Sequence, residues 1–179
     1  MDAMLQHPDP PLSDGVITLR AKGREDVDTL VAICQDPEIS RWTRVPSPYT
    51  REDAEGWIAA AELDRLAGLG IDWLAVDDEG DVVASIAVQH IRPDARVGEI
   101  GYWVAAPARG RGIATRAVCL AAGWALRDLG LRTLELMTLE DNLASQGVAR
   151  AAGFNQTGET DVPPNEGLAS GRYVVFTAP

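Results

Sequence analysis

The motif RGRG at residues 109–112 has the residue types and the spacing that hold a phosphate group. Glycines let the backbone come close to a ligand and turn successive N–H groups toward an anion. The apolar, alanine-rich run Ile113–Leu126 predicts a helix whose first N–H groups and dipole would add to the same site. The two arginines of the motif and Arg116 carry charge that pairs with phosphate. The stretch therefore predicts a binding loop for a phosphorylated cofactor.

A strand must lead into this loop and hold it in place. Residues 98–104 (GEIGYWV) are aromatic and β-branched enough to form that strand, and Pro107 ends it. The loop then lies at the carboxyl end of a strand, which is where open α/β sheets bind their ligands.

The rest of the chain alternates between strand patterns and helix patterns. Thr50 and Asp53 approximate a capping box, Asp77–Asp81 joins two strands as a turn, and Asp141 or Asn142 caps a late helix. We expect strands at 16–20, 71–76, 82–91, 98–104, 131–139 and 171–177, helices at 24–35, 50–66, 113–128 and 142–152, a short helical turn at 39–42, and a loop containing Pro163-Pro164 before the last strand.

This order predicts a three-layer α/β (α+β) fold, with a mixed, mostly antiparallel sheet of six to seven strands and helices on both faces. The strands at 98–104 and 131–139, which a helix connects, should be parallel by the right-handed crossover rule. Residues 1–15 are rich in proline and are expected to form a flexible lead-in. Residues 16–179 are expected to form a single domain, since the chain has 179 residues.

The composition is that of a soluble globular protein. The chain has 27 acidic and 16 basic residues, and the net charge of −11 argues against nucleic-acid binding and against an anionic membrane surface. The charge mildly favours a cationic substrate. No apolar run is long enough to span a membrane, and the N-terminus lacks a signal-peptide pattern. Cys34 and Cys119 are expected to be buried thiols in a cytoplasmic protein, and no cluster of metal ligands is present.

Together with its strand and helix, the motif resembles the acyl-CoA signature of the GNAT superfamily of N-acetyltransferases, Q/R-x-x-G-x-G/A. The matching residues here are Arg109-x-x-Gly112-x-Ala114. Two further features agree in order and spacing, because Asn142-Leu-Ala-Ser145 opens the next helix and Arg150-Ala-Ala-Gly153-Phe154 closes it. The resemblance implies the acyl-CoA N-acyltransferase (GNAT) fold.

The N-terminal part narrows the resemblance to one branch of this superfamily. The segments ITLRA, Asp36-Pro37 and Pro48-Tyr-Thr50 before Trp57-Ile58 resemble the RimJ/RimL-like branch, which acts on the N-termini of ribosomal proteins. With GEIGYWV added, the resemblance covers residues 16–176, nearly the whole chain.

The resemblance also implies acetyl-CoA as the co-substrate and no metal. The pyrophosphate would lie on the loop, and the pantetheine arm would pair with the backbone of the 98–104 strand, where the N–H of Val104 would point at the thioester oxygen. Val104 would thus act in catalysis through its main chain. The residues implied to contact the cofactor are Tyr102, Trp103, Val104, Arg109, Gly110, Arg111, Gly112, Ile113, Ala114, Thr115 and Asn142.

Proton handling departs from the commonest pattern of the superfamily. Many members carry a tyrosine seven residues after the helix-opening Asn as the general acid to the thiolate, and that position here is Ala149. Ser145 lies on the same helix face and is the candidate for contacting the thiolate, directly or through water. A serine bonded to its own helical turn is an equal alternative.

The acceptor amine has a pKa of about 10 and must lose a proton before attack. Glu99 is the candidate base, acting through water, and His90 is the runner-up. An ordinary solvated or paired glutamate remains open at that position. Trp42 and Tyr49 are candidates for walling the acceptor site, whereas Trp57 lies on an apolar helical stripe and is expected in the core.

The leading hypothesis is an acetyl-CoA-dependent N-acetyltransferase that acts on a protein N-terminus or a small cationic amine, as a monomer or a homodimer. A catalytically silent acyl-CoA-binding module is the alternative, because Ala149 replaces the usual tyrosine. A dinucleotide-binding domain fails on its pattern, since Thr115 stands where the third glycine of that motif belongs.

Overall fold

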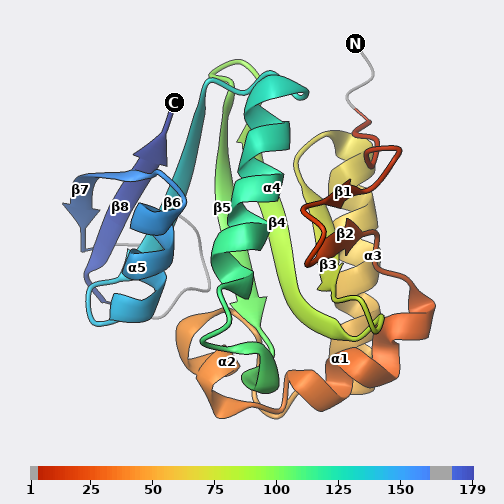
Figure 1. Ribbon diagram of the computed structural model, residues 1–179. Coiled ribbons are helices and arrows are strands. Elements are labelled where there is room, and N and C mark those ends of the chain that lie inside the picture. Colours follow the sequence, from red (N-terminus) through yellow and green to blue (C-terminus); the bar gives the residue numbers. More distant parts are fainter. Residues whose placement is uncertain (1–3, 162–170) are drawn as a thin grey trace.

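An eight-stranded mixed sheet forms the centre of the protein (Figure 1). The structure, a computed structural model, describes residues 4–161 and 171–179. The strands are β1 (Leu12–Ser13), β2 (Thr18–Arg20), β3 (Ile71–Val76), β4 (Val82–Arg92), β5 (Val97–Val104), β6 (Thr133–Leu139), β7 (Asn155–Thr160) and β8 (Tyr173–Ala178). The helices are α1 (Val27–Ile33), α2 (Pro37–Trp42), α3 (Arg51–Ala67), α4 (Ile113–Arg127) and α5 (Leu143–Ala151), with short 3₁₀ turns η1 (Arg24–Asp26) and η2 (Ala106–Ala108).

The strands follow the order β1-β2-β3-β4-β5-β6-β8-β7 across the sheet. Strands β5 and β6 pair in parallel, which confirms the expectation from the crossover rule, and the other neighbouring strands are antiparallel. The parallel pairing is short, because only Val97–Glu99 and Thr133–Glu135 face one another. Beyond these residues the two strands part.

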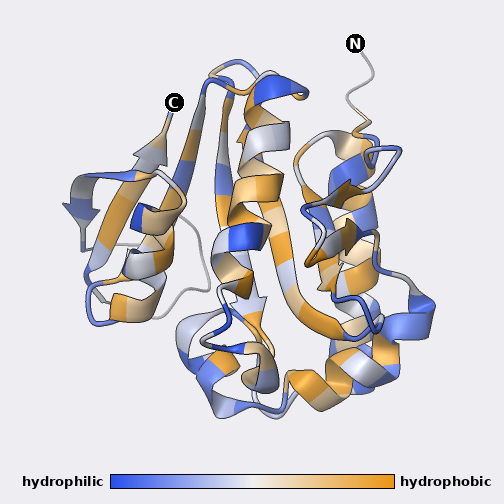
Figure 2. Ribbon diagram, in the orientation of Figure 1, coloured by the Kyte–Doolittle hydropathy of each residue, from blue (hydrophilic) through white to orange (hydrophobic). Residues whose placement is uncertain are grey.

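The helices cover both faces of the sheet, as the sequence predicts. Helix α4 crosses the near face in Figure 1, α5 lies beside it over β6 and β8, and α3 lies behind β3. The α4 face holds the larger core, in which the rings of Trp73 and Trp124 meet edge to face at 5.4 Å. A second core joins α1, α2 and α3 to the other face through Leu74 and Trp103. Figure 2 shows the largely apolar course of β4 and the mixed surface of α4.

Two strands were absent from the sequence prediction, and the expected six to seven strands become eight. Strand β1 has only two residues, and β7 (NQTGET) is polar and exposed along most of its length. Neither has the alternating apolar pattern that marks a strand, so both depend on backbone pairing with a neighbour. The sheet thus begins within the proline-rich lead-in, and the loop predicted after Phe154 begins as a strand. The loop at Pro163-Pro164 lies outside the described residues.

The local signals at the helix starts were confirmed. Thr50 and Asp53 form the predicted capping box of α3, and the Asn142 side chain caps α5 by accepting from the Ser145 N–H. The prediction of two buried thiols was half wrong. Cys34 is buried, and burial raises the pKa of its thiol to about 12, but Cys119 is exposed because it lies on the solvent side of α4.

The described part of the chain contains no helix with the length and apolar character needed to cross a membrane.

Asp26 ties β2 to the start of α1, and its loss should destabilise the fold. Its carboxylate accepts from both terminal nitrogens of Arg20, at 2.6 and 2.9 Å, and from the Gly23 N–H at 2.8 Å. Burial acts to raise the pKa of Asp26, but these hydrogen bonds outweigh burial and hold the pKa below its ordinary value. Asp26→Asn should lower the free energy of unfolding by about 2 kcal/mol at pH 7.

The difference should depend on pH. A depressed carboxyl pKa stabilises the fold above the unfolded pKa of about 3.9, and this contribution is lost as the pH falls below that value. The wild type and Asp26→Asn should therefore converge in stability in acid, as urea unfolding at several pH values would measure. The control is Asp28→Asn, two residues further along the chain, because Asp28 is exposed and pairs with Arg51 at the surface. An Asp26 effect no larger than that of Asp28 would contradict the assignment.

Candidate active site

A cleft of about 800 Å³ opens where β5 and β6 part. Residues 100–104 of β5 line one side and Leu136–Leu139 of β6 line the other. The loop that leads into α4, the start of α5, and α2 with the segment after it complete the lining. The separation of the two strands therefore makes the cavity, and the flanking helices wall it.

The parted strand β5 turns backbone N–H groups into this cleft. The Ala105 N–H donates to the Val83 carbonyl oxygen on β4 at 2.9 Å. Because backbone groups alternate along a strand, the N–H groups of Tyr102 and Val104 point the opposite way, toward β6. The pairing with β6 ends at Glu99, so in the described chain no strand faces these two groups. They are free to pair with an extended ligand.

The RGRG loop has the backbone geometry of an anion site. Gly110 and Gly112 have φ of +72° and +75°, and a Cβ at either position would meet only open space. Gly112 is the N-cap of α4 and supplies no side-chain cap, so the first N–H groups of that helix remain available. Apart from Arg111, every residue of 109–115 lines the cleft. The space beside both glycines is therefore open to a ligand.

The arginines differ from the sequence expectation of three available cations. Arg109 pairs with Asp36 at 2.6 Å, and Arg116 pairs with Asp14 at the same distance. Arg111 is exposed and lies outside the cleft lining. Of these three arginines, only Arg109 borders the cleft, whereas the main-chain N–H groups at the start of α4 have no side-chain cap.

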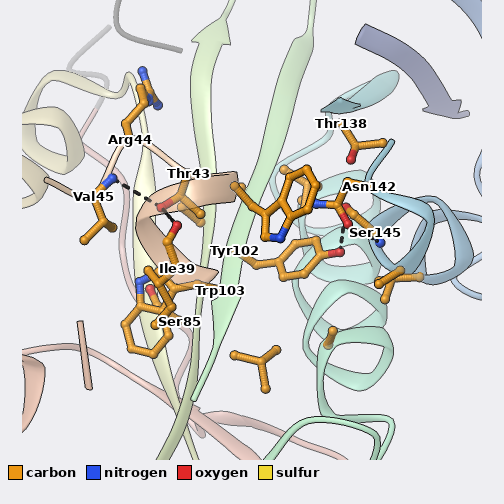
Figure 3. Close-up of a pocket in the computed structure, with 18 of the residues that line it drawn as sticks. Ile39, Thr43, Arg44, Val45, Ser85, Tyr102, Trp103, Thr138, Asn142 and Ser145 are labelled. Atoms are coloured by element: carbon orange, nitrogen blue, oxygen red, sulfur yellow. Dashed lines mark hydrogen bonds between the residues drawn. The ribbon is translucent and has the colours of Figure 1, made fainter. Parts of the chain in front are cut away.

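Tyr102 and Ser145 meet on the α4–α5 side of the cleft (Figure 3). Their hydroxyl oxygens lie 2.8 Å apart, one carried by β5 and the other by the first turn of α5. The Asn142 cap fixes this turn, with 3.1 Å from the Ser145 N to the Asn142 Oδ1. Burial raises the pKa of Tyr102, and the hydrogen bond with Ser145 acts in the opposite direction. Ala149, one turn further along α5, is fully buried.

Glu99 lies on the opposite face of β5, the face that α1, α2 and α3 cover. It is only 9% exposed and lines the cleft. One carboxylate oxygen accepts from the Gln89 Nε2 at 3.0 Å, and the other lies 3.3 Å from the His90 Nδ1. Arg44 in turn donates to the Gln89 Oε1 at 3.3 Å. The two sequence candidates for the base, Glu99 and His90, are thus in contact with one another.

The expected acceptor residues Trp42 and Tyr49 both line the cleft. Trp42 is half-buried, with its Nε1 donating to Glu38 at 3.0 Å. Tyr49 is 5% exposed and belongs to the second core. Trp57 packs against that core, as expected, but it also borders the cleft, with the Lys22 ammonium 3.6 Å from its ring centroid.

Sequence reasoning missed Gln89 and the cleft-lining part of β6. Gln89 belongs to no motif, and its contact with Glu99 follows from the strand register that places the two residues opposite one another. The alternation of residues 133–139 predicted a strand, but no local signal showed that this strand parts from β5. In the described part of the chain, no group of three or more His, Cys, Asp or Glu side chains gathers as a metal site would require.

Comparisons with known proteins bear on the family and the fold. The family described as "Acetyltransferase (GNAT) domain" matches residues 17–155, and no curated protein matches the chain. A putative ribosomal-protein-serine acetyltransferase from Vibrio cholerae superposes with a TM-score of 0.82 at 18% identity, over 97% of this chain and 99% of that one. RimJ from Mycobacterium smegmatis, in complex with CoA-disulfide, gives 0.82 and 18%, over 92% and 82% of the two chains.

A spermidine N-acetyltransferase from Vibrio cholerae, in complex with CoA and spermine, gives a TM-score of 0.77 at 17% identity, over 92% of this chain and 96% of that one. At such identities the structural likeness confirms the expected fold, and the family match extends over most of the chain. The protein therefore belongs to the GNAT family and is an acetyl-CoA-dependent N-acetyltransferase.

Proposed function

We propose that this protein transfers the acetyl group of acetyl-CoA directly to a primary amine, with both substrates bound in the cleft between β5 and β6. The observation that carries the proposal is the combination of open backbone N–H groups on β5 with the glycine loop at one end of the same cleft. Glu99 and Ser145 lie on opposite sides of that strand. The cleft therefore offers a binding strand, an anion loop and two proton-handling groups.

The residues of the cleft fit acetyl-CoA, which supplies the activated acetyl group as a thioester. The N–H groups of residues 110–115 would hold the pyrophosphate, with Arg109 beside it. The N–H groups of Tyr102 and Val104 would hold the pantetheine arm as a neighbouring strand would. In this position the Val104 N–H donates to the thioester oxygen, where negative charge develops during attack.

The two groups proposed to accept and to donate a proton or hydrogen bond, Glu99 and Ser145, lie on opposite faces of β5. Glu99 takes up the proton that the acceptor amine must lose, directly or through a water molecule. Its contact with His90 gives that proton a route onward. On the other face, the Ser145 hydroxyl donates a hydrogen bond to the sulfur as the carbon–sulfur bond breaks and the sulfur takes the electron pair. The departing thiolate then gains its proton from solvent.

The acceptor would enter past α2, where Trp42 and Tyr49 border the cleft. Four carboxylates line this cleft: Glu38, Asp53, Asp72 and Glu99. Asp72 is neutralised by Lys22 at 2.8 Å, but the net charge of −11 still favours the approach of a cation. Neighbours of the same fold include a ribosomal-protein acetyltransferase and a spermidine acetyltransferase. A protein N-terminus or a small cationic amine is therefore the proposed acceptor class.

The test is a thiol-release assay with acetyl-CoA and a panel of amines. The panel should contain peptides with free N-termini, polyamines, and an N-blocked peptide as the control. We expect acetylation of at least one free amine and none of the blocked peptide, with the acetylated product identified by mass spectrometry. Tight binding of acetyl-CoA without acetylation of any amine would instead support a catalytically silent acyl-CoA-binding module.

A further inference from the structure

The Tyr102 hydroxyl is a titratable group in the cleft that the reaction proposed above leaves without a role. It extends from β5 to within 2.8 Å of the Ser145 Oγ, across 43 residues of sequence. Both residues line the cleft, and the rest of Tyr102 packs against the α4-side core. The contact joins β5 to α5, the helix that carries Ser145, the residue proposed to contact the thiolate.

We infer that Tyr102 is a positioning residue: its phenol donates to the Ser145 Oγ and thereby aims the Ser145 proton at the sulfur of the leaving thiolate. The inference rests on the proposed function, because it assigns a partner to the group that contacts the sulfur.

The number of protons that each hydroxyl can donate supports a hydrogen bond from Tyr102 to Ser145. A serine hydroxyl has one proton and can accept two further bonds, and near a helix start its proton commonly turns back to a local carbonyl. A phenol also has one proton, and burial without an acceptor would be costly. When Tyr102 donates to Ser145, the phenol is satisfied and the serine proton is left for the cleft.

The acidities of the groups indicate what Tyr102 does not do. A thiol has a pKa of about 8.5 and a phenol about 10, so complete proton transfer from Tyr102 to the thiolate would be uphill. Burial raises the pKa of Tyr102 further, which keeps the phenol protonated where the acceptor amine is reactive. The role assigned to Tyr102 is therefore a fixed hydrogen bond to Ser145.

The two supports of Ser145 are independent. The Asn142 side chain holds its backbone N–H, and the Tyr102 hydroxyl holds its side chain. Loss of the phenol should therefore leave α5 in place and free only the rotation of the hydroxyl. A variant of Tyr102 therefore tests the position of the Ser145 hydroxyl without changing the stability of α5.

The test is a pH titration of CoA bound to the full-length protein, followed by the ultraviolet absorbance of its thiolate. A correctly aimed Ser145 proton stabilises the thiolate, so wild-type protein should lower the pKa of the bound thiol relative to free CoA. In Tyr102→Phe the pKa of the bound thiol should return toward the free value by about one unit, which corresponds to one hydrogen bond to a charged group. Ser145→Ala should have an equal or larger effect, and the double variant should go no further than Ser145→Ala.

Turnover provides the second readout. Tyr102→Phe should lower kcat by about tenfold and change the KM for acetyl-CoA by less than about threefold, because the bond matters only when charge reaches the sulfur. The control is Thr157→Val, which removes an exposed hydroxyl from β7, outside the lining of the cleft. It should leave both the titration and kcat close to wild type.

The outcomes separate the two proposals. An unchanged thiol pKa in Tyr102→Phe, or losses in the double variant that multiply, would overturn the positioning role even if the wild type acetylates amines. A perturbed thiol pKa that depends on Tyr102, in a protein that acetylates no amine of the panel, would support the positioning role and count against the proposed acceptor class.

Discussion

Gly112→Val should weaken acetyl-CoA binding by at least about a hundredfold and leave the fold intact. A Cβ at residue 112 would meet no protein atom, so the new side chain would occupy the space proposed for the pyrophosphate. At φ of +75° a β-branched residue is also strained, which costs about 1–2 kcal/mol and disturbs the loop N–H groups. Isothermal titration with acetyl-CoA would measure the affinity, and thermal unfolding would measure the stability.

Gly80→Val is the matched control for this variant. Gly80 has φ of +86°, and a Cβ there would likewise meet nothing within 4 Å, but it lies in the turn between β3 and β4, away from the cleft. The control should lose similar stability through backbone strain and bind acetyl-CoA with wild-type affinity. If both variants bind the cofactor equally well, the loop is not the pyrophosphate site.

Glu99→Gln should lower kcat by about 10²–10³-fold, because removal of a general base typically has this effect. The amide has nearly the shape of the carboxylate and can still contact Gln89 and His90, so the affinity for acetyl-CoA should be unchanged. The remaining rate should rise with pH toward the pKa of the acceptor amine, since more amine is then unprotonated without help. Steady-state kinetics across this pH range would measure both effects.

Glu135→Gln is the control for Glu99→Gln. Glu135 faces Glu99 in the parallel β5–β6 register and pairs with Arg92 at 3.2 Å, but it lies outside the lining of the main cleft. Its replacement should change kcat by less than about threefold. Equal kinetic effects at the two positions would indicate a general electrostatic influence, and the assignment of Glu99 as the base would be lost.

The helices and strands around the site could be predicted because their signals are local. The alternation of residues 133–139 and the capping residue Thr50 act within a few residues, and the structure follows both closely. Strand β7 could not be predicted, because its residues are polar and exposed and lack the apolar alternation of a strand, and its backbone pairing with β8 leaves no local signal. The exposure of Cys119 has a similar origin, since an alanine-rich helix gives little indication of which of its sides faces solvent.

The cofactor loop could be predicted from its glycines, but the cleft that continues it could not. Strand β6 leaves β5 after Glu135 while its other edge stays paired with β8 from Leu134 to Leu139. The pairing of β6 with β8 rather than with β5 depends on three strands that lie far apart in the sequence. The contact between Tyr102 and Ser145 could not be predicted either. Strand alternation and helix periodicity indicate on which face of its own element each residue lies, but only the packing of α5 against the sheet brings the two residues together.

A crystal structure of the protein with bound CoA would show whether the cofactor lies in the cleft between β5 and β6. We predict the pyrophosphate on the N–H groups of residues 110–115, the pantetheine arm beside Tyr102–Val104 between β5 and β6, and the sulfur within hydrogen-bonding distance of the Ser145 hydroxyl. Glu99 should lie across β5 from that sulfur. A cofactor bound elsewhere, or a sulfur that points away from both Ser145 and the Glu99 side of the cleft, would rule out the proposed active site.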